Sequence, residues 1–349
     1  LGELALAEGD APAAEAAFRR ALSIDPEHAP ALVGLARIAL ARGDLAGARA
    51  GVEQALAVDP GRLDARRLHG ELLWKAGDPK GAEADFRAVT EAAPREAAGF
   101  TRLGAVRLEL GDQAGALKAL ESSTGLDGNQ ADGQFWLGRA LLAKGELPGA
   151  LTRLKRAVEL DPAAAQHHLW YGVALERGNS LVEAVEAYRA AAAADPKLAE
   201  AWERVGNVYA GVGRCEDAVP AFEKALAAAP ALLRVKIAIA DCREKQAKHD
   251  AAIKLYREVL KADAKAVAVY YKMARALHES AGAKAAVPWY ERAAREEPDN
   301  PMPYYYLGFA YKDRGQRARA VQLFRQYLQK KPDAEDKKDI ELEIEDLGG

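Results

Sequence analysis

Apolar and polar positions along this sequence follow a helical pattern with a 34-residue period. In the stretch 199–232, one apolar stripe at helical spacing consists of Trp202, Val205, Gly206 and Tyr209. A second stripe at i, i+3, i+4 and i+7 spacing consists of Ala218, Val219, Phe222, Ala225 and Leu226. The pattern therefore predicts two antiparallel helices per repeat, the first ending at Gly213 and the second closed by Pro230.

Small residues and prolines hold the same register from end to end. Prolines separated by one or two of these periods stand at 26, 60, 94, 162, 196, 230, 298 and 332. Alanine recurs at every equivalent of Ala14, up to Ala320. Because small residues let two helices approach closely, we expect the paired helices to cross near Gly206 and Ala218.

A second series of glycines marks the turn inside each repeat. Its members are at positions 9, 43, 77, 111, 145, 213 and 315. An acidic residue often follows, as in Gly9-Asp10 and Gly43-Asp44. We expect these glycines to end the first helices in a left-handed backbone conformation.

The spacing of these residues resembles the tetratricopeptide repeat. One unit that carries the family pattern has Trp202, Gly206, Tyr209, Ala218, Phe222, Ala225 and Pro230; the last has Tyr304, Leu307, Gly308, Tyr311, Ala320, Phe324 and Pro332. The resemblance implies an all-α, right-handed superhelical solenoid of antiparallel helix pairs. It covers residues 1–334, with a truncated first repeat and further repeats starting near 29, 63, 97, 131, 165, 199, 233, 267 and 301.

Residues 335–349 leave the 34-residue register. Ile340, Ile344 and Leu347 form an apolar stripe, and glutamates occupy the positions between them. This pattern favours a C-terminal capping helix that covers the last repeat. The alternative is an acidic peptide that binds a partner.

Composition narrows the function classes. Among 349 residues, 49 Lys and Arg against 52 Asp and Glu give a net charge of −3, which argues against an ordinary basic nucleic-acid binder. No apolar run is long enough for membrane insertion. Residues 231–332 hold 21 basic and 11 acidic residues, so an acidic partner is one expectation and a merely solvated outer face the other.

Candidate chemistry is sparse. The sequence lacks phosphate-binding glycine loops, HExxH and a nucleophile elbow. Cys215 and Cys242 are too few for a structural zinc site, and the six histidines are interpreted as structural. We therefore expect no enzyme activity, no catalytic residues, no cofactor and no metal.

The resemblance implies a non-catalytic scaffold or adaptor that binds a protein or peptide in a concave groove lined by the first helices. The position after each first-helix glycine faces this groove. Candidate binding residues in the last repeats are Tyr271, Arg275, Tyr305 and Phe309, with Met302 and His278 at the edge. Further candidates are Asn207, Arg139 and Phe135. The tyrosines can equally be expected to pack between repeats.

Two recognition modes of the family fit this sequence poorly. A carboxylate clamp needs a lysine where Glu203 precedes Asn207, and an asparagine ladder needs more than Asn207 alone. A different hypothesis makes the chain the recognition arm of a larger enzyme or of a bacterial envelope, secretion or pilus assembly machine. Self-association through an uncapped first repeat is a third. The Ala, Arg and Gly content suggests a bacterial source, with cytoplasm and periplasm both open.

Overall fold

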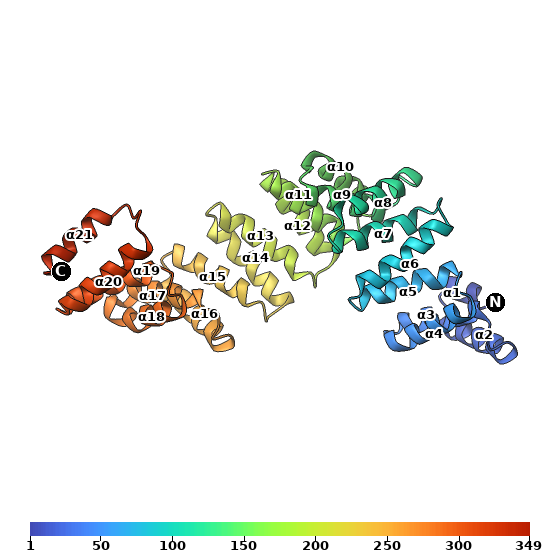
Figure 1. Ribbon diagram of the computed structural model, residues 1–349, viewed down its shortest axis with the longest axis horizontal. Coiled ribbons are helices and arrows are strands. Elements are labelled where there is room, and N and C mark those ends of the chain that lie inside the picture. The colour runs from blue at the N-terminus through green and yellow to red at the C-terminus, as the bar shows by residue number, and fades with distance from the viewer. The chain divides into compact units, whose positions relative to one another are not determined.

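The computed structural model describes residues 1–349 and consists of 21 α-helices joined by short turns, without a strand (Figure 1). None of these helices is both long and apolar enough to span a membrane. The chain divides into two units, residues 1–187 (unit 1) and 188–349 (unit 2), each described by itself.

Unit 1 contains eleven complete helices. They are α1 (Gly2–Ala7), α2 (Ala11–Ile24), α3 (Ala29–Ala41), α4 (Leu45–Val58), α5 (Leu63–Lys75), α6 (Pro79–Ala92), α7 (Ala97–Glu109), α8 (Gln113–Leu126), α9 (Ala131–Lys144), α10 (Leu147–Leu160) and α11 (Ala165–Arg177). The next helix, α12 (Leu181–Ala194), contains the boundary between the units.

Unit 2 continues with nine further helices. They are α13 (Ala199–Gly211), α14 (Cys215–Ala228), α15 (Leu233–Lys245), α16 (His249–Ala262), α17 (Ala268–Ala281), α18 (Ala283–Glu296), α19 (Met302–Asp313), α20 (Arg317–Lys330) and α21 (Lys337–Asp346).

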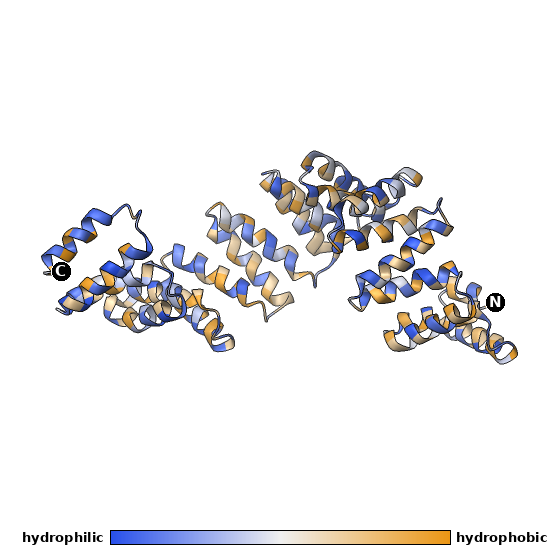
Figure 2. Ribbon diagram, viewed as in Figure 1, coloured by the Kyte–Doolittle hydropathy of each residue, from blue (hydrophilic) through white to orange (hydrophobic).

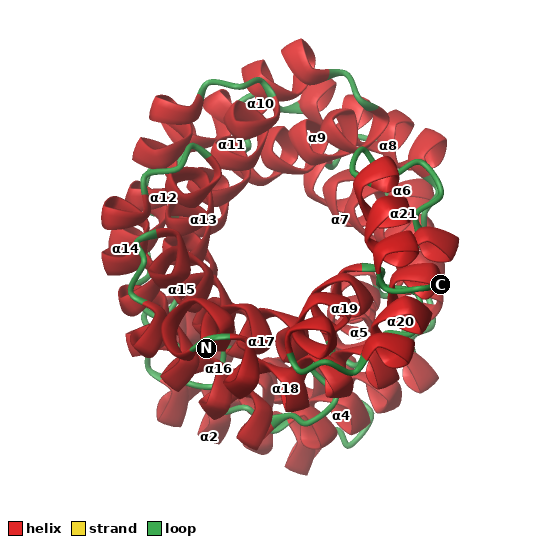
Figure 3. Cartoon of the chain, turned by 90° about the vertical axis from the view of Figure 1, so that its left-hand side faces the viewer, coloured by secondary structure: helices red, strands yellow, loops and turns green.

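Helices pack in sequential pairs. In unit 1, α3 packs against α4, α5 against α6, and α9 against α10, and each second helix also contacts the first helix that follows it. Unit 2 repeats this arrangement from α13 to α20. In unit 1 the first helices α7, α9 and α11 form the inner layer of the stack and α8 and α10 the outer layer (Figure 3). In unit 2 the inner layer consists of α13, α15, α17 and α19, and the outer layer of α14, α16, α18 and α20 (Figure 3). The fold is thus an all-α solenoid of helix pairs, as the sequence predicts.

The side chains between the two layers are apolar, and hydrophobic and hydrophilic residues share most helices (Figure 2). The closest approach lies at the first-helix glycine. A Cβ atom at Gly206 would overlap the Phe222 ring, and one at Gly138 would lie 2.6 Å from Leu154 Cγ. The helix crossing is therefore filled by a large side chain from the second helix of the same repeat, and not only by the small residue expected there.

The turn glycines adopt the predicted left-handed conformation. Gly9, Gly43, Gly77, Gly111, Gly145, Gly213 and Gly315 all have positive φ, between 70° and 87°. At equivalent positions Asn179 has φ 61° and Ala247 φ 57°. The turn conformation is thus a property of the repeat, and it persists even where the residue carries a Cβ that disfavours it.

An aspartate after the turn glycine caps the second helix in four repeats of unit 1, whereas Glu146 at the same place makes no capping hydrogen bond. The carboxylates of Asp10, Asp44, Asp78 and Asp112 each accept a hydrogen bond from a backbone N–H three residues later, at 2.8–3.0 Å. These bonds satisfy amide groups that have no partner inside the helix. In unit 2 the equivalent residues Arg214, Lys248 and Gln316 make no such bond.

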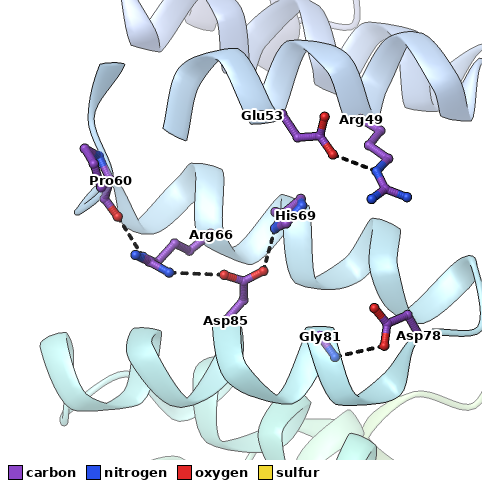
Figure 4. A network of polar contacts seen from close by, with 8 residues as sticks. All are labelled: Arg49, Glu53, Pro60, Arg66, His69, Asp78, Gly81 and Asp85. Carbon is purple, nitrogen blue, oxygen red and sulfur yellow. Dashed lines mark hydrogen bonds and ion pairs between the residues drawn. The ribbon is translucent and has the colours of Figure 1, made fainter. Parts of the chain in front are cut away.

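A polar network joins α5 to α6 in unit 1 (Figure 4). Asp85 is 6% exposed, and its carboxylate lies 2.6 Å from His69 Nδ1 and 3.2 Å from Arg66 NH1. Arg66 also donates through Nε to the carbonyl of Pro60 at 2.8 Å. Both oxygens of this buried carboxylate are therefore paired, as the interior requires.

The last helix packs against the helix before it. On α21 the side chains of Ile340 and Ile344 are 2% and 8% exposed, and α21 contacts α20. The Tyr327 hydroxyl donates to Asp336 at 2.7 Å, just before α21 begins. Leu342, on the other face, is 58% exposed.

Candidate partner-binding site

Aromatic side chains of α17, α18 and α19 meet in unit 2. We call this group the tyrosine cluster, and its members are Tyr271, His278, Tyr290, Tyr305, Tyr306 and Phe309. The rings of Tyr290 and Tyr306 stack, with centroids 5.1 Å apart and planes 7° from parallel. Tyr271 lies 6.4 Å from Tyr306, and His278 lies 5.6 Å from it. Tyr306 is therefore the centre of the cluster.

Tyr305 and Phe309 form the C-terminal edge of the cluster. Their ring centroids are 5.0 Å apart. Tyr305 also lies 5.2 Å from Tyr327, and Phe309 lies 4.9 Å from Phe324. Both residues are half-buried, as is Met302, which packs against the same core. Each ring therefore serves the packing between repeats and leaves part of its surface exposed.

A charged groove adjoins the cluster. It has a volume of about 430 Å³ and is lined by Asp241, Glu244, Lys245, His249, Lys272, Arg275 and Glu279. The guanidinium of Arg275, which is exposed, lies 3.1 Å from the Glu244 carboxylate. The Tyr256 hydroxyl donates to Asp241 at 2.6 Å and lies 3.2 Å from Glu244. Arg275 is thus shared between the charged groove and the tyrosines.

The candidate residues of the last repeats therefore belong to one connected surface. Tyr271 and Arg275 lie on α17 beside Tyr306, and Tyr305 and Phe309 lie on α19. Tyr306 links these two pairs, since its ring lies 5.2 Å from that of Tyr305, but the sequence did not single it out. Tyr306 directly follows the candidate Tyr305, so it would have been found if the neighbours of each groove-facing position had been considered.

Glu244 was also missed. It lies three positions after Asp241 on α15, which puts both carboxylates on one helix face. Because Glu244 is mostly buried, with a side chain 12% exposed, its ion pair with Arg275 holds the guanidinium at the rim of the groove.

The remaining candidates belong neither to the tyrosine cluster nor to the charged groove. Asn207 is exposed on α13. Phe135, on α9, is 6% exposed and packs on Trp136 and His167, with centroids 5.3 Å and 4.8 Å away. Arg139, one turn further along α9, is half-buried. Phe135 thus offers a ligand almost no surface, whereas Asn207 and Arg139 remain accessible.

The positive charge of residues 231–332 is mostly paired on the inner layer. Seven Lys and Arg side chains lie on α15, α17 and α19, and all but Lys245 lie within ion-pair distance of a carboxylate. Arg257 on the outer helix α16 is instead exposed and has no ion pair. Net charge alone therefore says little about what the groove binds.

Burial favours the neutral forms of one tyrosine and one cysteine in unit 2. It raises the pKa of Tyr271, with a further contribution from the adjacent Tyr306 hydroxyl. Burial and the neighbouring Cys215 raise the pKa of the Cys242 thiol to about 12. The structure holds no cluster of three or more His, Cys, Asp or Glu side chains arranged to bind a metal.

Comparison with known families decides the classification. Three tetratricopeptide repeat models match residues 5–72, then 67–131, 135–199, 204–267 and 237–301, and finally 304–334. The chain belongs to the tetratricopeptide repeat family. Tetratricopeptide repeats form protein-interaction scaffolds that bind protein or peptide partners, and their fold is generally non-catalytic. No curated protein matches the sequence.

Two solved structures with TM-scores of 0.50 and above show the same fold. A chain of the APC/C hetero-tetramer Cut9-Hcn1 is 17% identical, with 87% of this chain and 59% of that one covered and a TM-score of 0.53. A tetratricopeptide repeat protein from Parabacteroides merdae ATCC 43184 is 14% identical, with 72% and 99% covered and a TM-score of 0.50. MamA is 27% identical over 46% of this chain and 93% of its own, with a TM-score of 0.41.

Proposed function

We propose that this tetratricopeptide repeat protein acts as an adaptor that binds an extended segment of a partner protein on the inner layer of unit 2. The site comprises the exposed parts of Tyr271, Tyr305 and Phe309 together with Arg275 and the charged groove. The observation that carries the proposal is that Arg275 adjoins both an aromatic surface and a charged groove.

The chemistry of the site defines the partner segment. Tyrosine and arginine are enriched among residues that dominate binding energy, because they combine large apolar area with a hydrogen-bonding end. The guanidinium of Arg275 is exposed and carries five N–H donors, so it can pair with an acidic group of the partner while it keeps its ion pair with the mostly buried Glu244 carboxylate. A segment with an aromatic or aliphatic residue beside an acidic one fits best.

The test uses the full-length protein as bait in lysate of the source organism, with retained proteins identified by mass spectrometry. The variants are Arg275→Glu and the double change Tyr305→Ala with Phe309→Ala. The control is Arg257→Glu, the same charge reversal on the outer helix α16. Melting curves show whether each variant stays folded.

We expect a protein retained by the wild type and the control to be lost, about tenfold or more, with both site variants. Retention that does not change in folded site variants would place the binding surface elsewhere. If the retained protein is an enzyme or assembly component, the chain serves as its recognition arm, which is the alternative role.

We further propose that α21 closes the solenoid of residues 1–334 as a C-terminal cap. The burial of Ile340 and Ile344 against α20 supports this role. Ile340→Ala should destabilise unit 2 by about 2–5 kcal/mol, the usual cost of truncating a core isoleucine. An unchanged unfolding midpoint would favour the alternative of a free acidic peptide.

Self-association through the first repeat stays a prediction. Leu4 and Ile24 are 60% and 79% exposed on α1 and α2. Light scattering would detect it as a mass that rises with concentration in the wild type and falls when both residues are replaced by Lys.

A further inference from the structure

A second arginine on the inner layer, in unit 1, has an unusual environment. The guanidinium carbon of Arg139 lies 4.4 Å from the ring centre of Trp136 on α9 and 4.1 Å from that of Trp170 on α11. Phe135 adds a third ring at 5.6 Å. Indole rings from two consecutive first helices therefore hold the planar cation by cation–π attraction.

The arginine has no acceptor for its N–H groups. Arg139 makes no ion pair within 4.0 Å and no hydrogen bond, and its Nε is buried without a partner. Burial lowers the pKa of Arg139 somewhat, and Glu109 partly offsets this, yet an arginine keeps its charge in any protein. The result is a fixed, half-buried cation whose hydrogen-bonding capacity is unused.

Arginines at the equivalent position of other repeats are paired. Arg37 lies 3.4 Å from Glu3, one repeat earlier. Arg275 lies 3.1 Å from Glu244, which belongs to the preceding first helix, α15. An inner-layer arginine at this position therefore ordinarily takes a carboxylate from the preceding repeat.

The preceding repeat offers Arg139 no such carboxylate. Ala105 stands where Glu3 stands relative to Arg37, and Leu108 stands where Glu244 stands relative to Arg275. The charge of Glu109 acts on Arg139 without an ion pair between them, and the Glu109 carboxylate accepts a hydrogen bond from the Trp74 indole N–H at 2.6 Å. Trp74 packs 5.7 Å from Trp136 and so extends the aromatic surface.

We propose that Arg139, held between Trp136 and Trp170, binds a carboxylate of a partner protein segment, either that of an acidic residue or that of a free C-terminus. The guanidinium edge pairs with both oxygens of a carboxylate in one plane. The indoles provide an apolar surface for the residues on either side. This site lies in unit 1 and the proposed function rests on unit 2, so either assignment can fail while the other stands.

A carboxylate fits better than a phosphate. The site offers one cation and has the Glu109 carboxylate nearby, so the local field suits a single negative charge. A phosphate group carries about −1.5 to −2 at pH 7 and is normally bound by several basic groups. The partial burial of Arg139 also strengthens a charged hydrogen bond relative to one in bulk water.

Nuclear magnetic resonance of the full-length protein labelled with ¹⁵N-arginine tests the site itself. The Nε–H signal of Arg139 is assigned by its absence from the Arg139→Lys variant. Sodium acetate is titrated against sodium chloride at constant ionic strength. We expect a saturable acetate shift for Arg139 that Arg37 does not show. An Arg139 shift no larger than that of Arg37 would overturn the proposal.

Three peptides identify the source of the carboxylate. They are acetyl-Leu-Ala-Glu-Ala-Leu-amide, the same peptide with Gln for Glu, and acetyl-Leu-Ala-Leu with a free C-terminus. We expect at least one carboxylate peptide to bind about tenfold more tightly than the Gln peptide. This preference should vanish in Arg139→Gln, weaken in Arg139→Lys and persist in Arg37→Gln.

Two results would contradict the assignment. One is a preference for the carboxylate peptides that persists in folded Arg139→Gln, because the anion would then bind elsewhere. The other is tighter binding of the matching phosphoserine peptide than of both carboxylate peptides, because that would identify a phosphate site. Arg139→Gln removes no hydrogen bond or ion pair, so its fold should be retained.

Discussion

Eleven of the twelve tyrosines lie in unit 2, whereas unit 1 has one tyrosine and three of the five tryptophans. Unit 1 holds 21 basic and 27 acidic residues, and unit 2 holds 28 and 25. Both units nevertheless follow the same 34-residue register with the same helix pairs. The register specifies the backbone, and the side chains placed on it differ enough to give each unit its own surface chemistry.

The difference extends into the helix crossings. Unit 1 fills them with apolar side chains such as Phe86, Leu120 and Leu154. At equivalent positions unit 2 has Phe222 and Phe324 in two crossings but Tyr256 and Tyr290 in two others, and these hydroxyls lie 2.6 Å from Asp241 and 3.4 Å from His278. Buried tyrosines need such partners. A hydrogen bond from the buried Tyr256 therefore connects the charged groove of unit 2 to the core, whereas Arg139 in unit 1 contacts only aromatic rings.

Of the substitutions that bear on the comparison of the two units, those at a helix crossing should have the largest effect. Gly206→Ala should destabilise unit 2 by roughly 1–3 kcal/mol, because the new methyl group overlaps the Phe222 ring. Gly211→Ala on the same helix meets nothing within 4 Å and should instead stabilise by about 0.5–1 kcal/mol. Urea unfolding measures both, with labelling of the buried Cys242 thiol as the signal for unit 2. Equal effects of the two substitutions would refute the close-packing explanation.

The second-largest effect is expected at the helix caps, which differ between the two units. Asp44→Ala should cost about 1 kcal/mol, because the carboxylate no longer accepts the N–H of Gly47. Gln316→Asp installs the same Gly-Asp turn in unit 2 and should gain a similar amount. Thermal melting measures both changes. A Gln316→Asp variant no more stable than the wild type would show that the missing cap does not distinguish unit 2.

Replacing Ala247 in its left-handed turn by glycine should give a smaller gain in stability. A left-handed conformation costs a residue with a Cβ roughly 1–2 kcal/mol, and glycine avoids this cost. Glycine also loosens the unfolded chain, which removes about 0.4–1 kcal/mol of the gain. Ala247→Gly should therefore stabilise unit 2 by roughly 0.5–1 kcal/mol in urea unfolding, and a loss of stability would contradict the observed turn.

The smallest effect depends on pH. The contact with His167, together with Arg102, holds the pKa of the Asp132 carboxyl below its usual range. A lowered folded-state pKa gives stability that is present above the unfolded pKa, about 3.9, and lost as the pH falls through the folded value. Asp132→Asn should therefore lower the melting temperature more at pH 7 than at pH 3, which lies below the unfolded pKa. An equal difference at both pH values would rule out the ionic contribution.

The sequence predicted the backbone well because each repeat supplies its own local signals. The seven turn glycines and the helices of residues 199–232 follow from short-range rules on φ and helical spacing. The left-handed turn at Asn179 agrees with the tolerance of asparagine for this conformation, whereas the one at Ala247 did not follow from the sequence, since alanine disfavours it. They form because the flanking helix pairs impose the turn.

The site could be predicted only in part. One groove-facing position of each repeat predicted Arg275 and Phe309. The position four residues before it predicted Tyr271 and Tyr305. The stacking of Arg139 between Trp136 and Trp170 depends on how α9 and α11 are offset in space. The lack of a carboxylate at Ala105 and Leu108 is visible in the sequence, but it gains meaning only from the observed ion pairs of Arg37 and Arg275 with the preceding repeat.

The central claim is that partners bind the inner layer of first helices. Site-specific photo-cross-linking from Asn207, which is exposed on α13, tests it with little disturbance of the packing. The matched outer position is Arg257, exposed on α16. With benzoylphenylalanine at each position in turn, irradiation in lysate of the source organism should give a discrete protein adduct from position 207 only. Adducts from position 257 alone, or equally from both positions, would contradict the account.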